Sequence, residues 1–309
     1  MDFSTKFTVR TDLADEVVEK TGEKRGKIGD GITFESKDEG KIHIDIVHIE
    51  NDTASESTGK PKGRYVTVTT GEVWKKNRDD FEEVVAVVGN IIKEMLPKKG
   101  LVLVAGLGNQ KISADAVGPF ALKNLIVSRH IKIMDETLYN SLGLGECACI
   151  APGVMGDTGA EAFELVKGAV DTLNPMAVVV VDALASRNVT RLAKTVQISD
   201  SGISPGSGVG NARHEISRNT LGVPTIAVGV PTVVEAHTLC RDLLEQSLGG
   251  DEDVLRYVEE RIPENAGRFF VCPKETDKII SCMAKLVGYS INFALHNGLA
   301  LSEMDEFLS

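Results

Sequence analysis

The stretch Ala177-Val178-Val179-Val180-Val181-Asp182-Ala183-Leu184-Ala185 holds eight apolar residues and a single carboxylate, Asp182. A short, continuous run rich in β-branched residues is typical of a strand buried on both faces of a parallel sheet. We therefore predict a strand over 177–181, with Asp182 at its carboxyl end, where open α/β sheets bind their ligands. An ionised carboxylate beside so much apolar surface costs free energy unless it is paired or hydrogen-bonded. Asp182 is thus either a structural hydrogen-bonding residue or a catalytic acid with a shifted pKa.

The rest of the chain alternates apolar runs with helical patterns. Further strands are predicted at residues 41–49, 64–69, 101–105, 147–151, 195–198 and 225–230. Helices are predicted at residues 79–95, 116–128, 158–173 and from Pro273 to about His296, and a polar loop at 51–63. This alternation predicts an α/β fold, with a mostly parallel sheet flanked by helices. The polar stretch 246–268 is expected to be a surface excursion from a single domain.

Composition restricts the classes of function. The chain has 309 residues, 42% of them hydrophobic, and a formal net charge of −11, which argues against a nucleic-acid partner. No apolar run approaches the roughly 20 residues that span a membrane, and the N-terminus lacks a secretory core. Five cysteines without a C-x-x-C pair argue against a disulfide framework or a structural zinc site. We expect a cytoplasmic protein with no membrane partner.

Two glycine motifs resemble a dinucleotide-binding turn and a nucleophile elbow, but adjacent residues argue against both. Gly106-Leu107-Gly108 follows a predicted strand, but Lys111 stands where a dinucleotide fingerprint has its third glycine, so a tight turn is the better interpretation. Gly202-Ile203-Ser204-Pro205-Gly206 matches a nucleophile elbow, but that elbow uses the N–H of the residue after serine, and Pro205 has none. Neither motif therefore predicts a cofactor or a nucleophilic serine.

The glycine-rich segment 201–211 supports a rival interpretation. It contains four glycines, and a phosphorylase- or nucleosidase-like α/β enzyme would use such a loop to bind phosphate. It lacks the lysine of a P-loop. The triplets at 157–159 and 200–202 spell the Asp-Thr/Ser-Gly motif of pepsin-like proteases, but those enzymes are all-β. The six histidines are dispersed, and although Glu235 and His237 could reach a cleft, we predict no metal site.

Asp115 is the second carboxylate of interest. It follows the loop after the predicted strand 101–105 and is, on propensity alone, an acid at the start of a helix. A catalytic role needs a second carboxylate within reach. Asp182 follows another strand of the same predicted sheet, and loops at one edge of a sheet can bring together residues 67 positions apart.

The chain resembles the spore germination protease family along nearly its whole length. The resemblance includes Arg10-Thr11-Asp12-Leu13-Ala14 and Gly59-Lys60-Pro61-Lys62-Gly63-Arg64-Tyr65-Val66-Thr67. Further blocks lie at residues 106–109, 115–119, 151–156, 182–187, 197–203, 205–211, 221–224, 230–234, 273–275 and 291–292. The chain departs from many members of that family by being short between about 245 and 270.

The resemblance implies a fold like that of the hydrogenase-maturation proteases and an atypical aspartic endopeptidase, with Asp115 and Asp182 as its catalytic pair. It implies small acid-soluble spore proteins as substrates, a location in the spore core and a homotetramer, with no cofactor. Substrate contacts are predicted for Asn109, Arg187, Asp200, Ser207 and Asn211. If the two aspartates are close, they share one proton, so that one acts as base and the other as acid.

The resemblance also implies a zymogen that removes its own N-terminus. Family substrates are cut after an acidic residue that precedes an apolar residue and alanine, as in Thr11-Asp12-Leu13-Ala14. We predict a prosegment of residues 1–12, a self-cleavage between Asp12 and Leu13, and a protease domain of residues 13–309. The alternative is that these residues are only the first turn of a helix, where acids are favoured.

Overall fold

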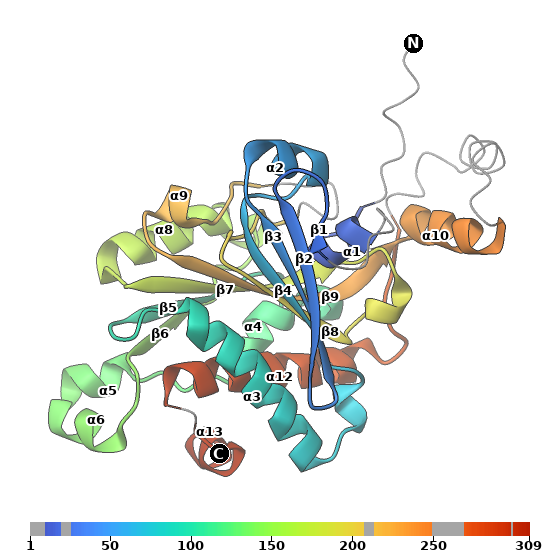
Figure 1. Ribbon diagram of the computed structural model, residues 1–309. Helices are drawn as coiled ribbons and strands as arrows, with labels where there is room; N and C mark the ends of the chain where they lie inside the picture. Colours follow the sequence, from blue (N-terminus) through green and yellow to red (C-terminus); the bar gives the residue numbers. More distant parts are fainter. Residues whose placement is uncertain (1–9, 20–25, 207–212, 249–268, 298) are drawn as a thin grey trace.

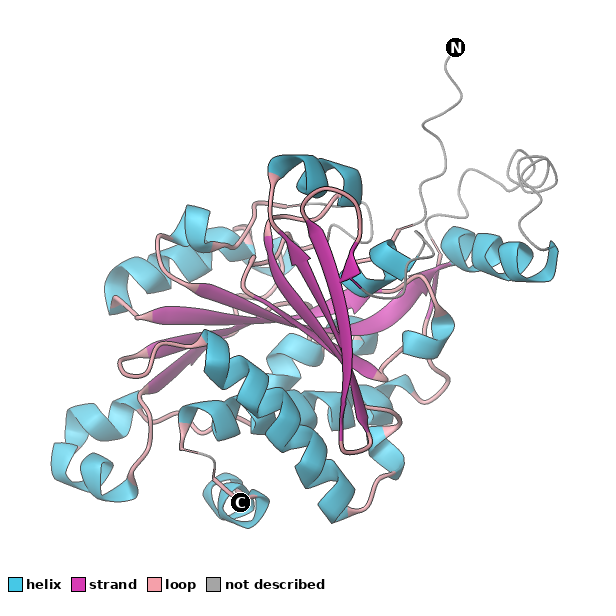
Figure 2. Cartoon of the chain, in the orientation of Figure 1, coloured by secondary structure: helices cyan, strands magenta, loops and turns pink. Residues whose placement is uncertain are grey.

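The computed structural model describes residues 10–19, 26–206, 213–248, 269–297 and 299–309 (Figure 1). Its strands are β1 (Gly26–Lys27), β2 (Ile32–Glu39), β3 (Ile42–Ile49), β4 (Gly63–Thr69), β5 (Val102–Gly106), β6 (Cys147–Ile150), β7 (Ala177–Ala185), β8 (Thr195–Ser199), β9 (Thr225–Glu235) and β10 (Phe270–Val271). They form one sheet in the order β1-β2-β3-β4-β8-β9-β7-β5-β6, with β10 added to β9. The sheet crosses the middle of the molecule, with helices on both sides (Figure 2).

The sheet is mixed, and its two halves differ in the direction in which their strands pair. Strands β9, β7, β5 and β6 pair in parallel, as the buried apolar runs predict. Strands β1, β2, β3, β4 and β8 pair in an antiparallel manner, and β8 joins this half to β9. The predicted α/β class is confirmed, while the antiparallel half makes the sheet less parallel than expected.

One face of the sheet carries the largest apolar cluster. It lies beneath α3 (Arg78–Met95), α4 (Val117–Leu122) and α12 (Thr276–Leu295), which Figure 1 shows on the same side of the strands. The predicted helical spacing in α3 is confirmed, because Val84, Val85, Val88 and Ile92 are buried against the sheet. Most of the side chains that close this face are apolar.

The opposite face carries two smaller apolar clusters. One lies between β5, β7 and the helices α8 (Ala162–Leu173) and α9 (Arg218–Leu221). The other lies between β2, β3, β4 and the helices α1 (Ala14–Glu19) and α2 (Asp52–Thr58). Polar residues of β7 and β8 lie between these two clusters, and the site described below is built there.

Several predicted boundaries were wrong for identifiable reasons. The predicted loop 51–63 contains α2, which Asn51 caps by accepting a hydrogen bond from Ala54 N at 2.8 Å. The predicted helix 116–128 ends at Leu122, because the Asn292 side chain binds Asn124 O at 2.9 Å and Ile126 N at 2.8 Å. Asn292, which belongs to α12, thus holds residues 124–126 in a non-helical conformation.

Other elements lie close to or beyond their predicted limits. Strands β7 and β9 run past 181 and 230 because they pair with each other along most of their length. Helices that the sequence did not predict include α9 and also α5 (Arg129–Met134), α6 (Glu136–Leu142), α7 (Met155–Thr158), α10 (Ala236–Leu248) and α13 (Leu301–Leu308). Most of the predicted excursion 246–268 lies outside the described residues. Within the described segments, no helix has both the length and the apolar character to cross a bilayer.

Candidate active site

A cleft of about 480 Å³ opens at the carboxyl ends of β5 and β7. Asp12, Gly108, Asp115, Asp182 and Thr232 are among the residues that line it. The cleft therefore lies at the edge where open α/β sheets place their ligands. It contains both carboxylates that the sequence singles out.

Asp182 is held within a strand but faces the cleft. Strand β5 ends at Gly106, which pairs with Val181, so Asp182 is the first residue of β7 beyond the end of that neighbour. Its side chain is only 6% exposed and accepts a hydrogen bond from Ala183 N at 2.9 Å. Burial raises the pKa of Asp182 well above its ordinary value, and the Asp115 carboxylate raises this pKa further.

Asp115 is positioned by the turn that follows β5. It ends the 3-10 turn η3 (Ser113–Asp115), and its carboxylate accepts a hydrogen bond from Asn109 N at 2.8 Å. Gly108 has a φ of +107° and packs on Asp115, so a side chain there would strike the Asp115 backbone oxygen. The expected tight turn at 106–108 is thus confirmed. Burial raises the pKa of Asp115 as well.

The structure thus brings Asp115 and Asp182 into one cleft and into electrostatic contact. Asp115 does not cap a helix, because α4 begins after Ala116 without a side-chain cap. A half-buried Asp115 beside a buried Asp182 favours a state in which the two carboxyls share one proton. Such a pair offers a base and an acid at the same time, which is the requirement for hydrolysis of an amide.

The N-terminal segment leads directly into this cleft. Asp12 lines it, Leu13 is fully buried, and α1 follows with Asp15 and Glu16 buried against the protein. Glu16 accepts hydrogen bonds from Arg187 N at 2.7 Å and Asn188 N at 3.0 Å. Burial raises the pKa of Glu16, and these donors oppose that rise. The helix is therefore anchored to the loop that follows β7.

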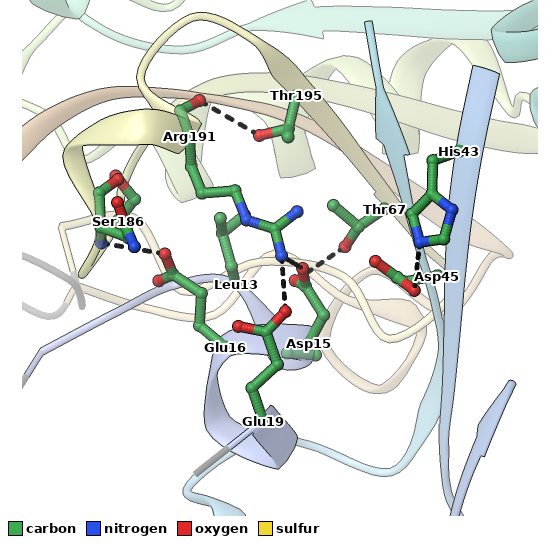
Figure 3. A network of polar contacts seen from close by, with 12 residues as sticks. Leu13, Asp15, Glu16, Glu19, His43, Asp45, Thr67, Ser186, Arg191 and Thr195 are labelled. Atoms are coloured by element: carbon green, nitrogen blue, oxygen red, sulfur yellow. Dashed lines mark hydrogen bonds and ion pairs between the residues drawn. The ribbon is translucent and has the colours of Figure 1, made fainter. Parts of the chain in front are cut away.

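A second anchor of α1 is shown in Figure 3. Arg191 forms ion pairs with Asp15 at 2.9 Å and with Glu19 at 2.7 Å, and Thr67 donates a hydrogen bond to Asp15 at 2.9 Å. Burial raises the pKa of Asp15 and the Arg191 guanidinium opposes this rise. With Asp45, these acids form the one group within the described segments whose oxygens lie close enough to hold a metal ion. Arg191 already places a positive charge beside two of the three acids.

The predicted substrate-binding residues that the structure describes lie outside the cleft lining. Asn109 contributes through its backbone N–H to Asp115, while its side-chain oxygen accepts a hydrogen bond from Lys111 N at 2.9 Å. Arg187 forms ion pairs with Asp242 at 2.8 Å and with Glu245. Asp200 accepts a hydrogen bond from Arg64 N at 2.7 Å. None of these three lines the cleft, and Ser207 and Asn211 lie outside the described residues.

The structure adds two residues that the sequence did not single out. A smaller pocket of about 110 Å³ adjoins the cleft and shares Asp12 and Leu184 with it. Lys60 and Gln197 line this pocket. Both residues fall within blocks of the family resemblance, which could have pointed to them. The residues around them in the sequence give no further indication of a site. The acid Glu235, considered above as a ligand, instead binds Arg10 at 3.1 Å.

Comparison with known proteins gives a consistent result. The model of the germination protease family matches residues 10–252. A germination protease of Clostridium perfringens is 38% identical to the chain, over 98% of this chain and all of that one. Germination proteases of Clostridium acetobutylicum and Priestia megaterium are 36% and 34% identical, over 98% and 95% of this chain and 99% and 95% of those proteins.

Comparison with solved structures finds a [NiFe] hydrogenase maturation protease, HycI, from Thermococcus kodakarensis KOD1. It has a TM-score of 0.30 and 14% sequence identity, and it covers 55% of this chain and 97% of that chain.

Proposed function

This chain belongs to the germination protease family, and on that premise we propose that it is an endopeptidase of the aspartic type. Its proposed substrates are small acid-soluble spore proteins. The observation that carries the proposal is that Asp115 and Asp182 line one cleft, where burial raises the pKa of Asp182 and the Asp115 charge raises it further.

The proposed reaction uses the pair in two roles. The ionised carboxylate accepts a proton from water while the water oxygen attacks the peptide carbonyl carbon. The protonated carboxyl then donates its proton to the departing amide nitrogen as the C–N bond breaks. The pair titrates as a unit with two macroscopic pKa values.

We also propose that the chain is made as a zymogen that removes residues 1–12. The support is the position of Asp12, which lines the same cleft as Asp115 and Asp182. Cleavage between Asp12 and Leu13 would leave α1 as the start of the mature chain. A homotetramer and a location in the spore core follow from the family resemblance alone and stay predictions, which light scattering and fractionation of spores test.

Incubation of the purified chain with a small acid-soluble spore protein tests the proposal. We expect discrete peptides, and we expect Asp115→Asn and Asp182→Asn each to slow their release by about 10²–10⁴-fold, as the loss of an acid or a base does. Asp157→Asn is the matched control, because Asp157 is ion-paired with Lys111 outside the cleft lining. Full activity of either active-site variant would contradict the assignment.

A parallel incubation with nucleosides and phosphate addresses the phosphorylase- or nucleosidase-like alternative. That interpretation depends on the glycine-rich segment 201–211, which lies partly outside the described residues. Turnover of a nucleoside with no release of peptides would favour it. Binding of protein without turnover of either substrate would instead indicate a non-catalytic binding protein.

A further inference from the structure

The segment before α1 reaches the cleft at Asp12 and is held there by several hydrogen bonds and an ion pair. Asp12 N donates to Ala185 O at 2.8 Å, and the Asp12 carboxylate accepts from Ala185 N at 2.8 Å. Lys60 Nζ donates to Thr11 O at 2.8 Å, and Arg10 binds the buried Glu235 at 3.1 Å. These contacts hold Asp12 in the cleft that contains Asp115 and Asp182.

Gln197 contacts this segment on both sides of Leu13. Its Nε2 donates to Asp12 O at 3.1 Å, and its Oε1 accepts from Ala14 N at 2.7 Å. The orientation of the amide follows from its partners, because Ala14 N–H can only donate and must meet the oxygen. The Nε2–H group is therefore directed at the Asp12 carbonyl oxygen. The peptide bond that follows this carbonyl joins Asp12 to Leu13.

The register of the sheet places Gln197 on the same face as Asp182. Gly229 of β9 pairs with Asp182 of β7 on one side and with Gln197 of β8 on the other. Residues that pair across strands project to the same face, and two strand spacings separate them by about 10 Å. The Leu184 side chain packs over Gly229 in the space between them. The carbonyl that Gln197 binds belongs to Asp12, which lines the cleft together with Asp182.

From this geometry we infer that Gln197 is a further catalytic residue, whose Nε2–H binds the oxygen of the carbonyl that is cleaved. The inference rests on the proposed function and adds a group to it. When the water oxygen attacks the Asp12 carbonyl carbon, the carbonyl oxygen gains negative charge that the Gln197 N–H stabilises. As the C–N bond breaks, the Leu13 nitrogen takes the proton of the protonated carboxyl and the carbonyl re-forms. Gln197 exchanges no proton and acts as an oxyanion donor.

A purely structural role for Gln197 makes a different prediction. If its amide only anchors the N-terminal segment, its loss would release residues 10–14 from the cleft. If it stabilises the oxyanion, its loss would slow the chemical step while the segment stays bound by Lys60, Ala185 and Glu235. Binding and chemistry must therefore be measured separately.

The experiment follows self-cleavage of the full chain by mass spectrometry. We expect the unaltered chain to be cut between Asp12 and Leu13, and Gln197→Met to be cut at the same bond about 10²–10³-fold more slowly, the usual loss for one oxyanion donor. Gln197→Glu keeps the acceptor for Ala14 N, but when ionised it has no proton to donate. Its rate relative to the unaltered chain should therefore rise as the pH falls.

Docking of the segment is measured in an Asp115→Asn background, in which self-cleavage is expected to be slow. We expect trypsin to cut after Arg10 at the same slow rate in Asp115→Asn and in the double variant Asp115→Asn with Gln197→Met. Faster trypsin cleavage that accounts for the slower self-cleavage would overturn the catalytic role in favour of a structural one. An unchanged rate of self-cleavage in Gln197→Met would also overturn it. If the unaltered chain is not cut at all, the proposed self-processing is wrong, and the role inferred for Gln197 is overturned with it.

Discussion

Asp182 and Gln197 lie on the same face of the sheet, one on each side of Gly229, because both pair with that glycine. The row continues through Thr67 to Asp45, which pair in register across β4 and β3. This polar row separates the two apolar clusters on that face. The N-terminal segment covers it, so the site depends on the pairing of five strands.

The first prediction concerns the coupling of the two aspartates. In Asp115→Asn, Asp182 loses a neighbouring like charge, so its pKa should fall. The pKa should remain above 3.8, because burial is the larger cause of the rise. Titration of the Asp182 carboxyl carbon by NMR measures this shift. The same pKa in both proteins would show that the two carboxyls do not interact, and Asp157→Asn should leave it unchanged.

The second prediction is that Asp182→Asn stabilises the protein at neutral pH. The folded-state pKa of Asp182 lies above its unfolded value, so the folded state binds the proton more tightly. This contribution to stability is complete at low pH and is lost as the pH rises through the folded pKa. Asparagine does not ionise, so the variant should gain about 1 kcal/mol at pH 7 and little at pH 3. Melting temperatures at both pH values provide the check, and equal gains would contradict the explanation.

The third prediction concerns the space between Asp182 and Gln197. In Gly229→Ala the new methyl group would meet the Leu184 side chain. We expect a loss of about 1–3 kcal/mol in the free energy of unfolding, typical of overpacking, together with slower self-cleavage. Gly168→Ala is the control, because this α8 glycine has open space around its Cβ position and alanine favours a helix by roughly 0.5–1 kcal/mol. Similar effects of the two substitutions would argue against a special role for Gly229.

The fourth prediction concerns the anchor of α1. Arg191→Met leaves Asp15 buried without its ion-pair partner, which should cost about 3–5 kcal/mol of stability. The pKa of Asp15 should rise further, so the loss should grow as the pH rises above the ordinary carboxyl value. Adding Asp15→Asn should recover most of the loss. Urea denaturation of the single and double variants measures these differences, and no recovery in the double variant would rule out the ion pair as the cause.

Hydrophobic patterns in the sequence predicted the buried strands of the sheet and the long amphipathic helix α3. The apolar run at 177–185 predicted a buried strand beside a ligand-binding edge, and the spacing in 79–95 predicted α3, because burial follows hydrophobic periodicity. The family resemblance selected Asp115 and Asp182, which the structure places in one cleft. Neither residue could be placed beside the other from its own neighbourhood.

The sequence by itself therefore determined the α/β class, the buried strands and the candidate carboxylates. Only the tertiary structure decided where the helix after Ala116 ends, since Asn292 binds the backbone at 124 and 126 from α12. It also decided that Gln197 meets the Asp12 carbonyl, since strand register sets Gln197 beside Gly229 and Asp182. The physical reason is that both outcomes depend on contacts between residues far apart in the chain, which hydrophobic periodicity does not encode.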